Sequence, residues 1–119
     1  MMKYENSTTG TFEGETWRDA RNGGYFQYNM MTGDESDLSL MVRYWGDETR
    51  NRTFDILIDD ELLVTENLVD KWKRKELVNV EYPIPATMIN GKKSVTVTFR
   101  SKPGNIAGGV FYIRLLKKE

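Results

Sequence analysis

The chain has 119 residues, which is near the usual size of a single domain and long enough to bury a hydrophobic core. Its 17 basic and 18 acidic residues leave a formal charge of −1, so it lacks the basic field that attracts nucleic acid or an anionic membrane. It contains no cysteine and no histidine, which excludes disulfides, thiolate metal sites and serine–histidine or cysteine–histidine mechanisms within this chain. No apolar run reaches the roughly 20 residues that span a bilayer. We therefore expect neither nucleic acid nor a membrane as a partner.

Apolar and polar residues alternate along much of the chain, which is typical of strands with one buried face. The threonine-rich stretch 95–100 is the clearest case, because Val95, Val97 and Phe99 share one face. Six strands are predicted in this way, in chain order at residues 24–31, 38–44, 54–59, 78–82, 95–100 and 111–115.

Turn-forming residues separate these strands. Asp59-Asp60-Glu61 predicts a tight hairpin that leads into a further strand at 62–64. Asn90-Gly91 predicts a turn before the threonine-rich strand, and one helical turn is expected at 85–90.

The pattern predicts an all-β fold, an antiparallel β-sandwich of about seven to eight strands. A small β-barrel is the alternative that alternation alone leaves open. Residues 16–119 are expected to form a single sandwich domain. Residues 1–15 are expected to be an N-terminal extension or a first edge strand.

If successive strands reverse direction, one end of the sandwich gathers the segment before Gly24, the loop after Trp45, and the loops at 67–75 and 102–108. All three tryptophans then lie at this end, together with several polar side chains. The candidate ligand-binding residues, with carbohydrate as the expected ligand class, are Trp17, Arg18, Asp19, Arg21, Trp45, Trp72 and Asn105.

The segment Trp17–Gly24 is expected to be a loop, and it has two interpretations. An indole offers a flat face to a sugar ring and arginine offers a rigid fork of donors, which favours a polar ligand site. Alternatively, an Arg–Asp pair holds the loop to the sandwich while Trp17 covers the core. Trp45 lies off the core face, so it is either a stacking platform or is covered by a loop or a neighbouring domain. Trp72, in a charged loop, is either a ligand contact or an anchor.

Two acidic clusters, at 34–37 and 59–61, carry oxygen ligands of the kind that calcium prefers, but both also fit ordinary turns. No cofactor or metal is expected, with a structural calcium ion as the alternative. No catalytic residue is expected either, because nothing in the pattern places two carboxylates across a cleft, as glycoside hydrolysis requires.

Five ordered motifs point to a family. They are Trp17-Arg18-Asp19-Ala20 with Gly23-Gly24-Tyr25-Phe26, Tyr44-Trp45-Gly46, residues 52–59, Tyr82-Pro83-Ile84-Pro85, and residues 103–111. From about Thr16 to Leu116 the chain resembles the C-terminal β-sandwich domain of bacterial proteins similar to glycoside hydrolase family 127, the β-L-arabinofuranosidase-like proteins. The wider similarity is to galactose-binding-like jelly rolls.

The resemblance implies a non-catalytic accessory domain that packs on, or supports, the catalytic domain of the same parent chain. It also implies an extracytoplasmic location, through that parent. No catalytic residue is carried over, because the catalytic domain and its cysteine and zinc chemistry have no counterpart here. The alternative function is a carbohydrate-binding module that uses the aromatic, Arg and Asp cluster at one end of the sandwich.

Overall fold

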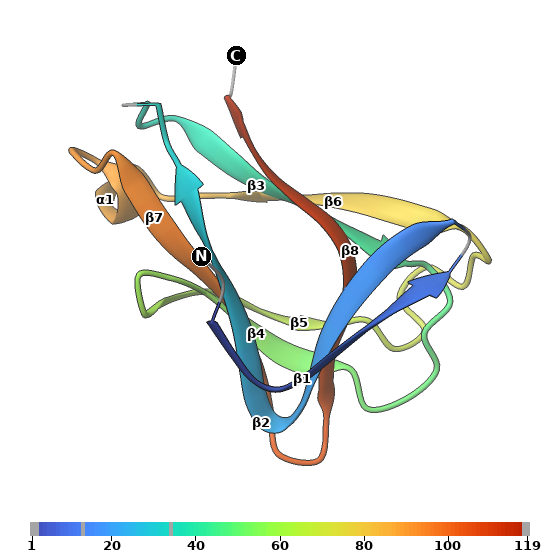
Figure 1. The fold of residues 1–119 in the computed structure, drawn as a ribbon. Coiled ribbons are helices and arrows are strands. Elements are labelled where there is room, and N and C mark those ends of the chain that lie inside the picture. Colours follow the sequence, from blue (N-terminus) through green and yellow to red (C-terminus); the bar gives the residue numbers. More distant parts are fainter. Residues whose placement is uncertain (1–2, 13, 34, 118–119) are drawn as a thin grey trace.

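The computed structural model describes residues 3–12, 14–33 and 35–117, which form eight strands and one short helix (Figure 1). In chain order the elements are β1 (Lys3–Phe12), β2 (Glu15–Met31), β3 (Leu38–Trp45), β4 (Thr53–Ile58), β5 (Glu61–Asn67), β6 (Leu77–Pro83), α1 (Ala86–Ile89), β7 (Ser94–Ser101) and β8 (Ile106–Lys117). No helix in this described part is long and apolar enough to cross a membrane.

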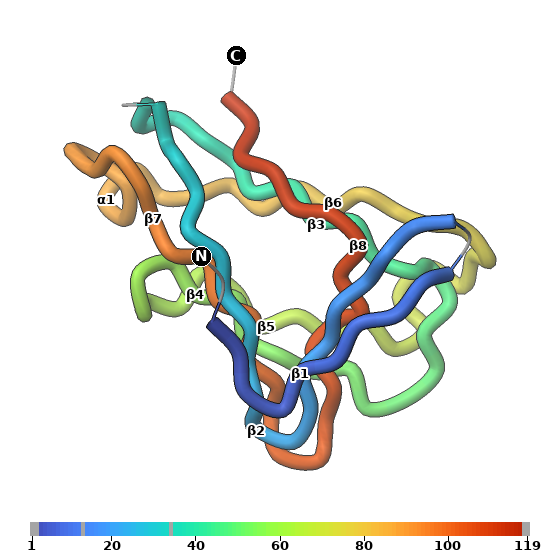
Figure 2. The backbone as a smooth tube through the Cα atoms, in the orientation of Figure 1, coloured from blue at the N-terminus to red at the C-terminus, as the bar shows by residue number. Residues whose placement is uncertain are grey.

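Strand β2 belongs to both layers of the molecule. The strands follow the antiparallel order β5-β4-β7-β2-β8-β3-β6, and β1 pairs with β2 outside this path. Residues 25–31 of β2 pair with β7, whereas residues 18–21 pair with β8. Between these halves the chain bends at Asn22 and Gly23, whose φ angles are +49° and +82°, values that Asn and Gly adopt readily. The bend curls the sheet into two facing layers (Figures 1 and 2), which confirms the predicted antiparallel sandwich.

The hydrophobic core lies between these layers. In β4, Phe54, Ile56 and Ile58 are buried, while the residues between them are partly exposed, as the alternation predicted. Phe26 and Phe99, from the two neighbouring strands β2 and β7, stack with ring centroids 5.0 Å apart. Burying such rings removes a large apolar area from water, which is the main force that holds the two layers together.

The predicted hairpin and helical turn are confirmed. Asp59 and Asp60 connect β4 to β5, and their φ angles of +48° and +67° are those of the mirror-image turns that match the twist of a hairpin. The helical turn is α1.

The prediction of a loop before Gly24 is wrong. Residues 15–21 are the first half of β2, paired with β1 on one side and with β8 on the other. Ala20 is the fully buried apolar residue of this half, so the apolar alternation that signals a strand is weak there. Residues 3–12 form β1, which bends at Asn6 and follows both halves of β2.

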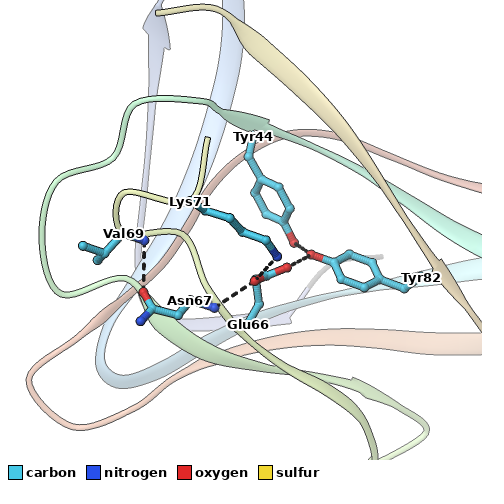
Figure 3. Close-up of polar contacts among 6 residues, drawn as sticks. All are labelled: Tyr44, Glu66, Asn67, Val69, Lys71 and Tyr82. Carbon is cyan, nitrogen blue, oxygen red and sulfur yellow. Dashed lines mark hydrogen bonds and ion pairs between the residues drawn. The ribbon is translucent and has the colours of Figure 1, made fainter. Parts of the chain in front are cut away.

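A buried carboxylate, Glu66 of β5, joins three elements inside the core (Figure 3). Its Oε2 accepts a hydrogen bond from the Tyr82 hydroxyl at 2.7 Å, and the hydroxyls of Tyr82 and Tyr44 are 2.8 Å apart. Its Oε1 accepts from Lys71 Nζ at 2.7 Å and from the Asn67 N–H at 2.9 Å. Burial raises the pKa of both tyrosine hydroxyls, so both remain protonated and Tyr44 donates to Tyr82. The network compensates a charge that would be costly to bury alone.

Backbone hydrogen bonds gather the connecting segments at one end of the sandwich, as the strand directions predicted. The segment 46–52, between β3 and β4, is held by both the segment 68–76 and the start of β8. The bonds are Gly46 N–H to Glu76 O at 2.9 Å, Arg74 N–H to Gly46 O at 3.1 Å, Asp70 N–H to Glu48 O at 3.0 Å and Ile106 N–H to Asn51 O at 2.7 Å.

Candidate functional site

A cavity of about 360 Å³ lies between the outer face of strands β1, β2 and β8 and the segment 46–52. Trp17, Asp19 and Arg21 alternate with the buried Ala20, so all three project to this outer face. The volume lies at the lower end of the range for small-molecule sites. The cavity is lined by Phe12, Trp17, Asp19, Arg21, Trp45, Glu48, Arg52, Ile106, Gly109 and Phe111.

Trp17 lies against the sheet because glycines flank it on both neighbouring strands. Gly10 of β1 is its register partner, and a Cβ atom there would be 2.5 Å from Cζ2 of the indole. On the other side, a Cβ atom at Gly109 would be 3.4 Å from the Trp17 Cβ atom. One face of the indole therefore rests on backbone that carries no side chain, a use of glycine typical of close approach within sheets.

Trp45 and Phe12 form a second aromatic wall. Their rings meet edge to face, with centroids 4.8 Å apart and an interplanar angle of 76°. This geometry is favourable for aromatic pairs, so each ring restrains the other. Trp45 ends β3 and is half-buried beside the cavity, whereas the preceding Tyr44 is fully buried in the core.

Asp19 is an almost buried carboxylate whose side chain is 6% exposed. Its Oδ1 accepts a hydrogen bond from Thr8 Oγ1 at 2.7 Å, and its Oδ2 is 3.7 Å from Arg21 Nη2. A carboxylate can accept about four hydrogen bonds, so most of the acceptor capacity of Asp19 is unused by the described residues.

Glu48 and Arg52 form a second ion pair across the cavity from β2, with Glu48 Oε1 3.4 Å from Arg52 Nη2. Arg52 Nη1 also donates to the carbonyl of Gly108 at 3.0 Å. Burial raises the pKa of the Glu48 carboxyl; Arg52 lowers it in part, and the carboxylates of Asp19 and Asp47 raise it further. The buried Nε of Arg52 has no hydrogen-bond partner among the described residues.

Four of the seven predicted site residues, Trp17, Asp19, Arg21 and Trp45, line this cavity. Arg18 points to the opposite face of β2, where its Nη1 donates to Ser7 Oγ at 2.8 Å. There it helps to line a second cavity of about 420 Å³, and residues Trp17 and Phe111 contribute to the lining of both cavities.

Trp72 and Asn105 lie at the same end of the sandwich but outside the cavity lining. Trp72 stacks on the buried Tyr44, with centroids 6.2 Å apart and an interplanar angle of 23°. Asn105 Oδ1 accepts from the Thr53 N–H at 3.2 Å, and its Nδ2 donates to the Pro103 carbonyl at 3.1 Å. Both side chains hold connecting segments in place.

Sequence reasoning missed six lining residues: Phe12, Glu48, Arg52, Ile106, Gly109 and Phe111. Glu48 and Arg52 sit in a connection between strands, where charged residues are ordinary and carry no signal. The adjacent glycines at 108 and 109 were a usable signal, because glycine within a strand often marks the close approach of another group.

The calcium alternative concerned two acidic clusters. At the 59–61 turn, the Asp59 carboxylate accepts hydrogen bonds from Lys92 Nζ at 2.7 Å and from the Thr96 N–H at 2.8 Å. The other cluster includes Asp34, which lies outside the described residues. Within residues 3–12, 14–33 and 35–117, no group of three or more acidic side chains is arranged to hold a metal ion.

A protein-family model of unknown function matches residues 1–116. The chain belongs to the family of unknown function DUF6805. No curated protein matches the sequence. The function of this family is unknown.

Solved carbohydrate-binding modules are similar to the DUF6805 domain. A family 35 module from Clostridium thermocellum matches with a TM-score of 0.69 at 13% identity, covering 98% of this chain and 92% of the module. The C-terminal family 6 module of LamC from Zobellia galactanivorans matches with a TM-score of 0.66 at 11% identity, covering 97% and 91%. An exo-β-1,3-galactanase from Phanerochaete chrysosporium matches with a TM-score of 0.74 at 13% identity, over 98% of this chain and 27% of the enzyme. At these identities the likeness shows the fold alone, a β-sandwich shared with these carbohydrate-binding modules.

Proposed function

We propose that the DUF6805 domain is a carbohydrate-binding module and that the cavity between β2 and the segment 46–52 is its ligand site. The observation that carries the proposal is the lining, in which the indoles of Trp17 and Trp45 stand beside the carboxylate of Asp19. Aromatic faces match the C–H faces of sugar rings, and carboxylates accept hydrogen bonds from hydroxyls. The fold shared with family 35 and family 6 modules supports the same function.

The site is held in place before a ligand arrives. The segment 46–52, which carries Glu48 and Arg52, is fixed by backbone hydrogen bonds to residues 68–76 and to Ile106. Trp17 is fixed by the glycines on either side of it. A site that is already ordered loses little conformational entropy on binding.

The test is a heteronuclear NMR titration of the domain with plant-type oligosaccharides, including arabinose-containing ones. Saturable shifts of the Trp17 and Trp45 indole N–H signals are expected, with a dissociation constant on the order of millimolar, about −4 kcal/mol. The Trp72 indole lies outside the cavity and serves as an internal control. If no saccharide shifts the Trp17 and Trp45 signals, even when its concentration is well above millimolar, the proposal is wrong.

A second function, the accessory role that the sequence favoured, also has an observation in its support. The matching region of the galactanase is 27% of that chain, so this fold occurs as one part of a larger enzyme. We propose that the DUF6805 domain likewise accompanies a catalytic domain, with a parent similar to glycoside hydrolase family 127 as the specific hypothesis. The similarity to binding modules nevertheless favours sugar binding over a purely structural contact. Hydrogen exchange without sugar can be compared between the intact parent chain and the isolated domain. Stronger protection of the cavity residues in the intact chain would favour the structural role.

A further inference from the structure

The ionised side chains that line the cavity cancel each other. Asp19 and Glu48 carry two negative charges, and Arg21 and Arg52 carry two positive charges. Each carboxylate already faces one arginine, at 3.7 Å for Asp19 with Arg21 and at 3.4 Å for Glu48 with Arg52. The cavity therefore has no surplus positive charge with which to hold an anion.

Negative charge is already concentrated around Glu48. The carboxylates of Asp19 and Asp47 both act on Glu48, in addition to the cost of its burial. The positive charge of Arg52 offsets these carboxylates in part, but its Nη1 already donates a hydrogen bond to the Gly108 carbonyl. A ligand carboxylate placed here would meet like charges at short range, which is a strong means of rejecting a partner.

The lining carboxylates have free acceptor capacity, beside one buried donor, the Nε of Arg52, that has no partner among the described residues. Asp19 accepts a hydrogen bond from Thr8 and retains further lone pairs, and its side chain is held almost entirely away from solvent. Such an acceptor is satisfied by hydroxyl donors, while the Trp17 and Trp45 rings provide apolar faces. A neutral sugar carries both of the matching groups, hydroxyl donors and uncharged C–H faces.

We infer that the ligand is a neutral sugar whose hydroxyl groups donate hydrogen bonds to Asp19 and Glu48, and that uronic acids are disfavoured at this site. This inference rests on the proposed function of the cavity. It narrows that function to one class of saccharide.

The experiment compares matched pairs that differ only in whether C6 carries a hydroxyl or a carboxylate. The pairs are galactose with galacturonate, glucose with glucuronate, and mannose with mannuronate, each titrated by NMR at low salt. The neutral member of at least one pair is expected to bind about tenfold or more tightly than its uronate, since like charges oppose only the latter. Equal or tighter binding of the uronate in every pair that binds overturns the inference and leaves the sugar site in place. If neither these sugars nor the oligosaccharides of the first titration shift the Trp17 and Trp45 signals, the proposed function itself fails.

The variant Asp19→Asn tests the role of the carboxylate. Asparagine retains an oxygen that accepts from Thr8 Oγ1, so the fold is expected to survive, which the melting temperature checks. Neutral sugars should bind about tenfold less tightly, because a charged acceptor is replaced by a weaker neutral one. The ratio of the affinity for the neutral sugar to the affinity for its uronate should fall toward one in each pair. Asp60→Asn, at the exposed hairpin turn, is the matched control. It should change neither the affinity for neutral sugars nor the affinity ratio. An unchanged ratio in Asp19→Asn excludes Asp19 as the source of the discrimination.

Discussion

The indole of Trp17 lies over Gly10 of the neighbouring strand, at a position where any other residue would place its Cβ atom 2.5 Å from the ring. Real Cβ atoms essentially never approach so closely, so the ring and a side chain at position 10 exclude each other. The two residues are direct register partners in the β1–β2 pair. A residue without a side chain on one strand thus determines where the aromatic face on the next strand lies.

Gly10→Ala is expected to displace the Trp17 indole and weaken saccharide binding by about tenfold, or about 1.4 kcal/mol. Stability should be retained, because alanine has less backbone entropy to lose than glycine when a strand forms. NMR titration and thermal unfolding measure the two effects. Thr11→Ala, on the same strand and exposed, should alter neither. Unchanged affinity in Gly10→Ala would show that the position of the indole does not matter.

The three tryptophans are expected to separate into two functional groups. Trp17→Ala and Trp45→Ala should each reduce saccharide affinity by about tenfold or more, since a stacking face is lost. Trp72→Ala should instead lower the free energy of unfolding by about 2 to 3 kcal/mol, because its ring packs on the buried Tyr44 and is itself half-buried. Denaturant unfolding and NMR titration distinguish the groups. Loss of binding in Trp72→Ala without loss of stability would contradict this assignment.

The strands with one clearly apolar face were predictable from the sequence, and β4 illustrates why. Phe54, Ile56 and Ile58 are all buried on one side, so period-two alternation is direct. The first half of β2 was not predictable, because Arg18 and Asp19 place charged groups on both of its faces. Their burial depends on partners from β1, the Ser7 and Thr8 hydroxyls, which no local pattern reveals.

The same limit applies to the candidate site. Trp17 and Trp45 were recognisable as unusual aromatic residues, but the strand register decides that Asp19 faces the cavity and Arg18 does not. Glu48 reaches the cavity because backbone hydrogen bonds between distant segments, such as Asp70 N–H to Glu48 O, fix the path of the chain. Long-range contacts of this kind leave no trace in residue spacing.

The buried network around Glu66 is expected to contribute strongly to stability. Glu66→Gln removes the charge that Lys71 and the Tyr82 hydroxyl stabilise, and should lower the free energy of unfolding by about 2 kcal/mol. Tyr82→Phe leaves the Tyr44 hydroxyl without its acceptor and should cost about 1 to 2 kcal/mol. In the double variant the two losses should not add, because both substitutions alter the same hydrogen bond between residues 66 and 82. Glu76→Gln, at an exposed ion pair with Arg74, is the control and should cost under about 0.5 kcal/mol. Simple additivity would argue against a coupled network.

Saccharide binding is expected to weaken as the pH falls, and the pKa of Glu48 determines the pH at which affinity begins to decline. Ligand hydroxyls donate to its ionised form, so affinity is greatest above the pKa of Glu48 and declines as the carboxyl is protonated. Burial raises that pKa, and the decline should therefore start at a higher pH than for an ordinary glutamate, whose pKa is about 4.3. Glu48→Gln should bind more weakly at neutral pH and lose this part of the pH dependence.

The carboxyl groups with shifted pKa values give stability a pH dependence that differs from that of binding. For Glu48 the sign is opposite, and for Asp55 and Asp59 the change lies at lower pH. Since the folded-state pKa of Glu48 is raised, protonating Glu48 adds stability as the pH falls. At Asp55 and Asp59, hydrogen bonds outweigh the cost of burial and lower the pKa of each carboxyl. Their contribution to stability is present above the unfolded-state value of about 3.9 and is lost only as the pH falls through the lower folded-state values. A thermal melt at each pH of the titration should therefore show a folded domain throughout the range in which binding is lost. Loss of affinity that coincides with unfolding would contradict the role given to Glu48.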